Sequence, residues 1–107
     1  MVIINIRMNA LPEKCLELKQ TLLALVESTR KKKGCLSHEV LQDMENDNGL
    51  SLIDVWDSRG DLDDHFRSAQ FKVLMGTRSL LSRSPEITMS EEASISSGWE
   101  ALEKIRR

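Results

Sequence analysis

Cysteine and histidine, the residues that most often bind transition metals, are scarce, with two of each among 107 residues. Cys15 and Cys35 have no metal-ligand spacing and are too few for a disulfide framework. We therefore expect no metal site, and we expect both cysteines to be small buried hydrophobic residues in a reducing cytosol. A glycine-rich phosphate loop and an ordered Ser-His-Asp set are also missing.

An excess of one charge and long apolar runs are missing as well. The 15 basic and 17 acidic side chains nearly cancel, which argues against nucleic-acid binding. The basic run at residues 30–33 falls where a helix should end, and cations there complement the helix dipole. No run approaches the ~20 apolar residues of a membrane span, and no signal peptide opens the sequence. We expect a cytoplasmic protein with no membrane or nucleic-acid partner.

The residues that are present suit one small globular domain, with 40% hydrophobic and 30% charged side chains. Periodicity and turn residues predict, in order, a strand over 2–8, a helix over about 12–33, strands over 35–43 and 50–57, a helix from 58 with a bend near 68, and a strand over 85–90. Gly34 would end the first helix as its C-terminal cap residue. This β-α-β-β-α-β order is the ferredoxin-like α+β arrangement, with both helices on one face of an antiparallel sheet.

The strand over residues 2–8 has two unlike faces. Its even-numbered positions are all apolar and should lie beneath the helices. Its odd-numbered positions are mixed and include Asn5 and Arg7, which we expect on the open face of the sheet. There they could donate hydrogen bonds to an oxyanion, or they could be satisfied polar groups of an interface.

The apolar residues on both faces of the strand over 50–57 predict a dimer. Ile53 and Val55 suit the helix side, which leaves Leu52 and Trp56 on the open face. A monomer rarely exposes so much contiguous apolar surface, and burying a Trp or Leu side chain stabilises by roughly 1.5–3 kcal/mol. We therefore expect the sheet of a second copy to cover this face. A cavity between the two sheets would be a natural ligand site.

The last seventeen residues extend beyond the predicted fold, so we divide the chain into a domain over 1–90 and a C-terminal extension over 91–107. Ser97 and Glu100 form a capping box, and an apolar stripe begins at Trp99. A helix of about ten residues is marginal alone in water. We expect this helix to dock on its own subunit or on the partner; a disordered tail is the alternative.

Four segments together resemble one family. They are residues 12–14, 29–39, 53–58 and 62–71. Their order and spacing resemble the antibiotic biosynthesis monooxygenase (ABM) domain over roughly residues 1–90. The most distinctive part is a Trp followed by a His-x-x-Ser-x-x-Phe pattern, which here is Trp56, His65, Ser68 and Phe71.

The resemblance implies a homodimer with sheets face to face, the dimeric α+β barrel, and a pocket between sheet and helices in each subunit. Members of the family include quinol and anthrone oxygenases that use no flavin or metal, which implies that no cofactor is needed. Others degrade haem, isomerise small molecules or have no known activity, and fold alone does not choose among these. The haem-degrading members have an axial histidine further along the second helix, where this chain has Met75.

His65 is the candidate catalytic base, because histidine titrates near neutral pH and the family pattern has His at this position. A structural histidine bonded to nearby backbone is the alternative. Trp56 and Phe66 would line the substrate pocket, although Trp56 could equally be an aromatic residue of the dimer core. Asp54 could orient the base, or it could form a structural ion pair with Arg7.

His38 is a possible second acid or base that contacts substrate. If the hairpin turns symmetrically about Asp47, His38 lies opposite Trp56 and on its face, whereas a slip of one residue reverses the face. The resemblance therefore implies a cofactor-independent monooxygenase that acts on a small aromatic molecule of quinol or anthrone type. Two alternatives stay open: a non-catalytic ligand-binding or stress-response dimer, and an isomerase that moves protons through His65.

Overall fold

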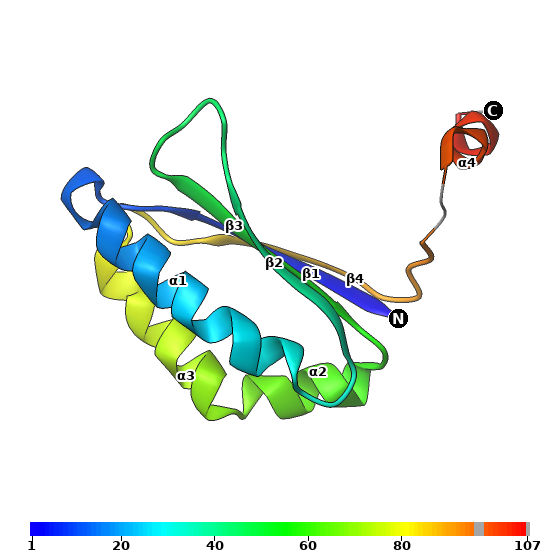
Figure 1. Ribbon diagram of the computed structural model, residues 1–107, viewed down its shortest axis with the longest axis horizontal. Helices are drawn as coiled ribbons and strands as arrows, with labels where there is room; N and C mark the ends of the chain where they lie inside the picture. The colour runs from blue at the N-terminus through cyan, green and yellow to red at the C-terminus, as the bar shows by residue number, and fades with distance from the viewer. Residues whose placement is uncertain (96–97, 107) are drawn as a thin grey trace.

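The computed structural model of the protein describes residues 1–95 and 98–106 (Figure 1). Its helices and strands are β1 (Val2–Asn9), α1 (Cys15–Arg30), β2 (Cys35–Gln42), β3 (Gly49–Trp56), α2 (Arg59–Phe66), α3 (Ala69–Gly76), β4 (Glu86–Ser90) and α4 (Gly98–Ile105). Two 3-10 turns, η1 (Pro12–Lys14) and η2 (Thr77–Leu80), precede α1 and follow α3.

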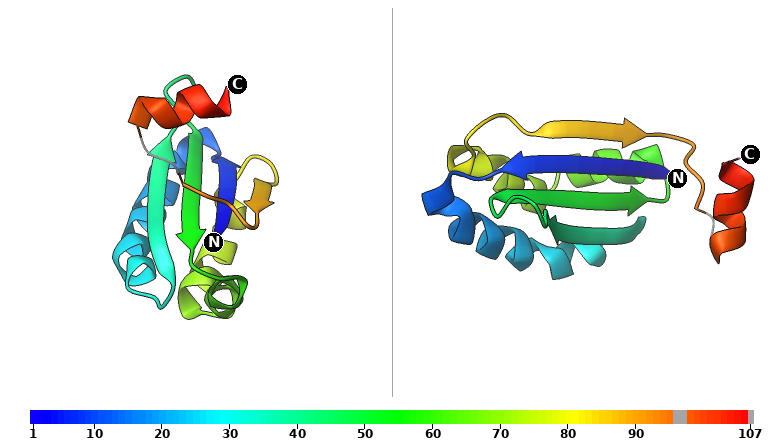
Figure 2. Two further views of the ribbon diagram at one scale, coloured as in Figure 1. Left: turned by 90° about the vertical axis from the view of Figure 1, so that its right-hand side faces the viewer. Right: turned by 90° about the horizontal axis from the view of Figure 1, so that it is seen from above.

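The four strands form one antiparallel sheet in the order β2-β3-β1-β4. Figure 1 shows α1, α2 and α3 together on one side of this sheet, and Figure 2 shows the strands of the sheet with these helices behind them. The predicted ferredoxin-like α+β fold is therefore confirmed.

The first helix ends earlier than its sequence pattern indicated. α1 stops at Arg30 rather than near Lys33, and a turn follows in which Cys35 N–H donates to the carbonyl of Lys32 at 3.1 Å. Gly34 lies in this turn with a φ of 82° and so does not cap the helix directly. Its carbonyl accepts from Asp57 N–H at 2.8 Å, which ties the start of β2 to the end of β3.

The bend predicted near residue 68 divides the second helical segment into α2 and α3. Ser58 caps α2 by accepting a hydrogen bond from Asp61 N–H, and Ser68 caps α3 by accepting one from Phe71 N–H, each at 3.2 Å. A second cap in mid-segment satisfies backbone donors that a break in the helix would otherwise leave unpaired. The bend lets α2 lie beneath the end of β3 while α3 runs beside α1.

The core lies between the sheet and the helices. One cluster joins β1 and β3 to α1; its buried members are Met8, Ala10, Cys15, Leu18, Leu22, Leu50 and Leu52. A second joins the other end of these strands to α2; its buried members are Val2, Ile4, Trp56 and Leu62. The even-numbered residues of β1 lie beneath the helices, as predicted.

The prediction that Leu52 and Trp56 of the third strand lie on the open face of the sheet was wrong. Val2 lies opposite Trp56, and Ile6 lies opposite Leu52. Residues directly opposed in an antiparallel pair share a face, so Leu52 and Trp56 lie on the helix side and are 4% and 0% exposed there. β3 has apolar residues on both faces, and only its register with β1 shows which of its faces lies against the helices.

The open face of the sheet carries the odd-numbered residues of β1 and β3. Ile53 lies opposite Asn5, and Val55 lies opposite Ile3. Val55 is buried among its neighbours, and the other three are half-buried. The centre of this face is therefore apolar, but it is less so than an exposed Leu52 and Trp56 would have made it.

The C-terminal segment leaves the sheet after β4 and reaches α4. Ala93 N–H donates to the carbonyl of Met1 at 3.2 Å, and Glu91 pairs with Arg59 at 2.6 Å. The predicted terminal helix is present, although Ser97 of the proposed capping box lies outside the described residues. Figure 1 shows α4 apart from the sheet and the other helices, and Trp99 is 82% exposed. No described helix is long and apolar enough to cross a membrane.

Both cysteines are free thiols. Cys15 is buried, and Cys35 is half-buried at the start of β2. Burial, and then the nearby charge of Asp54, raises the pKa of the Cys35 thiol, while Arg30 lowers it to a smaller extent. The thiol therefore stays protonated and weakly reactive at neutral pH.

Candidate active site

A buried hydrogen bond between two side chains joins the two strands of the central hairpin. His38 of β2 lies opposite Asp54 of β3, and His38 Nδ1 is 2.5 Å from Asp54 Oδ1. The two residues are 4% and 6% exposed. Arg30, at the end of α1, donates from Nε to the His38 carbonyl at 3.0 Å and fixes the strand beside the helix.

His38 shares a face with Trp56, as its symmetric hairpin predicted, but it lies opposite a different residue. The hairpin turns about Asn46, whose carbonyl accepts from Gly49 N–H at 2.9 Å, rather than about Asp47. Moving the turn by one residue moves every cross-strand partner by two, which preserves the face. The partner of His38 is therefore Asp54.

His65 completes a cluster with this pair from the helix side. It lies on α2, is 6% exposed, and places Nε2 4.0 Å from Asp54 Oδ2. Its ring stacks on Trp56, with centroids 4.7 Å apart and planes at 27°. The edge of Phe71 contacts it from α3, with centroids 5.6 Å apart. Asp54 thus lies between two histidines, one on the neighbouring strand and one on the covering helix.

The surroundings of His65 keep its imidazole neutral. Burial lowers the pKa of His65 below the ordinary 6.5, and Lys32 and His38 lower it further, while the Asp54 carboxylate opposes them. Desolvation outweighs the carboxylate because that group is 4.0 Å away, beyond hydrogen-bond distance. A neutral imidazole at physiological pH is a competent proton acceptor.

Three nitrogen atoms in this region are buried without a hydrogen-bond partner among the described residues. They are His38 Nε2, His65 Nδ1 and Trp56 Nε1. Buried polar atoms of folded proteins nearly always have a partner, either a protein group or an ordered water. Each nitrogen is therefore a position where a polar atom of a ligand would be stabilised.

A small cavity of about 20 Å³ lies against this cluster, lined by Asp54 and both histidines together with apolar residues that include Ile4, Leu62 and Phe66. This volume holds about one water-sized molecule. Trp56, which stacks on the His65 ring, is not among the residues that line it. A larger cleft of about 520 Å³ shares Ile6, Phe71 and Leu74 with the cavity.

Asn5 and Arg7, which the sequence placed beside Asp54, lie on the opposite face of the sheet. Arg7 is 3.8 Å from Asp43 rather than paired with Asp54, and Asn5 Oδ1 is buried without a partner among the described residues. The ion pair considered between Arg7 and Asp54 is therefore not formed, and neither Asn5 nor Arg7 lines the cavity that His65 lines, because the third strand turns its other face to the helices.

The lining residues that were not predicted as site residues include Gln70 and Phe71. Phe71 was visible as the last position of the His-x-x-Ser-x-x-Phe pattern, and its contact with His65 depends on the bend at Ser68. Within residues 1–95 and 98–106, no group of three or more His, Cys, Asp or Glu side chains is arranged to hold a metal ion.

Comparisons with known proteins found relatives that are similar to this chain in sequence and in fold. A curated relative, an uncharacterized protein of Synechocystis sp., is 34% identical over 59 residues, which are 55% of this chain but 38% of that protein. A conserved protein from Methanosarcina mazei Go1 is 29% identical with a TM-score of 0.81, covering 86% of this chain and 92% of that chain. A Mycobacterium tuberculosis protein is 25% identical with a TM-score of 0.82, covering 90% and 98%.

The fold and the buried His-Asp-His cluster define a small α+β protein with an ionisable site between its sheet and its helices. The family model described as antibiotic biosynthesis monooxygenase matches residues 1–76, which include both histidines, Asp54 and Trp56. This chain therefore belongs to the antibiotic biosynthesis monooxygenase family, as the sequence resemblance predicted.

Proposed function

We propose that this protein is a cofactor-independent monooxygenase that oxidises a small aromatic molecule of quinol or anthrone type. One observation carries the proposal: His38, Asp54 and His65 form a buried cluster against an apolar cavity, and two nitrogens of the cluster have no partner among the described residues. Oxygenation without a cofactor needs a base that is neutral near pH 7, a low-polarity pocket and a substrate rich in electrons. The first two requirements match this cluster.

His65 would remove the proton that activates the substrate. The Asp54 carboxylate faces Nε2, which favours the tautomer with hydrogen on Nε2 and leaves the lone pair of Nδ1 free. Nδ1 then accepts the substrate proton, and Asp54 stabilises the imidazolium that forms. His38, held on the other oxygen of Asp54, would donate from Nε2 to a developing oxyanion when it carries its proton there.

The substrate itself would supply the electrons. Its anion transfers them to dioxygen; one oxygen atom enters the product, and the second leaves as water with the two hydrogens that the substrate loses. The cavity of about 20 Å³ suits a molecule as small as dioxygen. The aromatic ring itself needs a larger space, and the cleft of about 520 Å³ is in the range of small-molecule sites.

We further propose that two copies associate through the open faces of their sheets, and that the protein acts in the cytoplasm. Ile53 and Val55 give this face an apolar centre, and the buried Asn5 Oδ1 has no partner in the described part of the chain, so a second copy would supply one. The two free thiols fit a reducing compartment.

Oxygen uptake tests the proposal. The purified protein, treated with a metal chelator, is mixed with a panel of hydroquinones and anthrones, and His65→Gln serves as the control that keeps most of the side-chain volume. We expect uptake above autoxidation by the native protein and a loss of that excess in the variant. Absence of uptake across the panel would reject the oxygenase and favour a binding or isomerase role.

A further inference from the structure

The larger cleft lies between the edge of the sheet and the end of the helical layer. Its walls come from β1, β4, α3, η2 and the loop at residues 81–85. Met8 and Ile87 line it from the sheet, while Leu74 and Met75 line it from α3. Its volume of about 520 Å³ and these apolar walls suit a flat organic ring system.

The charged residues that line this cleft are all cations. Arg78 and Arg83 line it, and no Asp or Glu does. In the part of the chain that the structure describes, neither arginine pairs with a carboxylate. The cleft is thus electropositive although the whole chain carries a net charge of −2.

Neutral partners hold the two guanidinium groups in place. Arg78 donates from Nε to the carbonyl of Met75 at 3.4 Å. Arg83 donates from Nη2 and Nε to the side-chain oxygen of Asn9, at 3.0 and 3.1 Å, when the Asn9 amide turns this oxygen toward it. These contacts restrain the side chains without neutralising their charge, so both retain N–H groups for an anion.

We infer that the cleft binds an aromatic molecule that carries a carboxylate, with the carboxylate on Arg78 and Arg83 and the ring on the apolar walls. The inference rests on the proposed function in one respect, that the bound molecule is the substrate. Ile6, Phe71 and Leu74 line both the cleft and the small cavity, and Phe71 contacts the His65 ring edge-on. The ring end of the ligand would therefore lie toward His65.

Calorimetric binding of two matched probes tests this inference. 2-Naphthoate and 2-naphthamide have the same ring system and differ in charge, and neither is a quinol or an anthrone, so no turnover is needed. We expect the native protein to bind naphthoate about tenfold more tightly than naphthamide, with the preference decreasing as salt is added.

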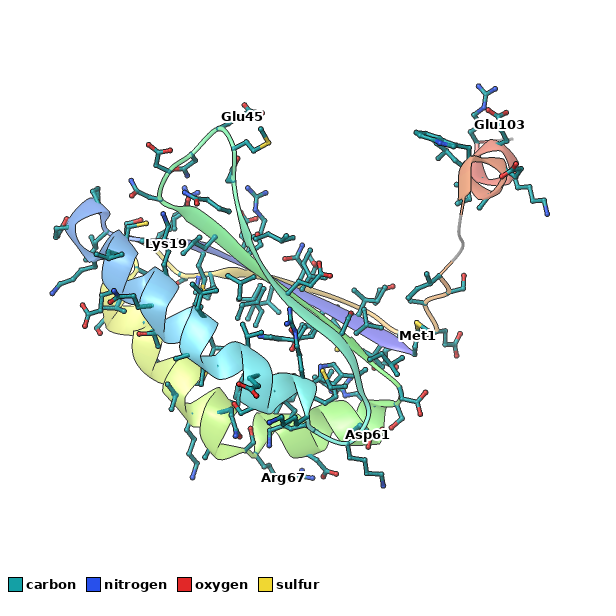
Figure 3. The ribbon with its side chains drawn as sticks, in the orientation of Figure 1. Met1, Lys19, Glu45, Asp61, Arg67 and Glu103 are labelled. Atoms are coloured by element: carbon teal, nitrogen blue, oxygen red, sulfur yellow. The ribbon has the colours of Figure 1, made fainter. Side chains whose placement is uncertain are left out.

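Three variants locate the binding site. Arg78→Gln and Arg83→Gln should each weaken naphthoate binding by about tenfold and change naphthamide binding less than about twofold. Arg67→Gln is the matched control, because Arg67 is exposed on the far side of the helical layer and pairs with Asp64 (Figure 3). All three arginines are exposed, so their replacement should leave the fold intact.

The outcomes separate this inference from the proposed function. Equal binding of the two probes, or an equal effect of Arg67→Gln, would overturn the inference even if neutral anthrones were oxidised. Arginine-dependent naphthoate binding without oxygen uptake by any substrate would support the binding site and reject the oxygenase.

Discussion

Asp54 lies directly opposite His38 across the central hairpin, and a buried hydrogen bond of 2.5 Å joins their side chains beneath the helices. Its second oxygen faces His65. Burying such a group stabilises a fold less than well-packed apolar side chains of the same volume would. A cluster of this kind, in which two nitrogens have no partner within residues 1–95 and 98–106, is expected where function rather than stability determined the residues.

Replacement of Asp54 by asparagine removes the negative charge of the side chain but keeps its shape, and so tests the effect of the charge on oxygen uptake. Asp54→Asn keeps a hydrogen-bond acceptor for His38 but removes the carboxylate that would stabilise a protonated His65. We expect the oxygen-uptake rate to fall by about 100-fold, the lower range for a lost acid–base contribution, with the circular dichroism spectrum unchanged. Asp57→Asn, one residue beyond the end of β3 and exposed, is the matched control and should retain the native rate. A native rate in Asp54→Asn would remove the carboxylate from the mechanism.

Acid should destabilise the protein through His65. Since burial lowers the pKa of His65 in the folded state, the unfolded chain binds more protons than the folded one just below pH 6.5. The free energy of unfolding should therefore fall as pH falls through this window.

Urea unfolding of the native protein and of His65→Gln at pH about 7.5 and about 5.5 measures this contribution. The native protein should lose more stability between the two values than the variant does. An equal loss in both proteins would contradict the lowered pKa of His65.

Alanine substitutions at Gly34 and Gly76 compare a strained backbone position with an unstrained one. Gly34 has a φ of 82°, and a Cβ at this position would overlap the carboxylate of Asp61, which Figure 3 shows at the end of the sheet. Gly34→Ala should lower the free energy of unfolding by about 1–3 kcal/mol. Gly76→Ala, at the end of α3 with open space around it, should raise it by about 0.4–1 kcal/mol. Similar effects of both substitutions in urea unfolding would show that the turn at Gly34 is not strained.

The terminal helix should contribute to the proposed dimer. α4 exposes an apolar stripe that includes Trp99, and a helix this short needs a docking surface. A chain ending at Ile95 keeps the Arg59–Glu91 ion pair and the hydrogen bond of Ala93 but lacks the helix. Sedimentation equilibrium should show weaker association of this truncated chain than of the full chain. Equal dissociation constants would exclude a role for α4 in the dimer.

Much of the fold could be predicted from local patterns in the sequence. The element order, the bend at Ser68 and the helix side of β1 are set by short-range signals: turn residues, capping side chains and a strand with one fully apolar face. The end of α1 was misplaced by three residues because the helical pattern runs on into a turn whose geometry depends on the contact of Gly34 with β3.

The site was harder to predict because it depends on register. His65, Trp56, Asp54 and His38 were named from sequence, but their mutual contacts require β3 to face the helices and the hairpin to turn about Asn46. Alternation alone cannot choose between two strand faces when both carry apolar residues. Pairing β3 with β1 by their apolar positions would have corrected the face and removed Asn5 and Arg7 from the site.

The most direct test of the cofactor-free mechanism uses ¹⁸O₂ with an anthrone and the chelator-treated protein. Mass spectrometry should find one labelled oxygen atom in the anthraquinone product and none from labelled water. The initial rate should fall to the autoxidation rate in His65→Gln. Unlabelled product, or an unchanged rate in His65→Gln with the protein still folded, would contradict oxygenation by the His38–Asp54–His65 cluster.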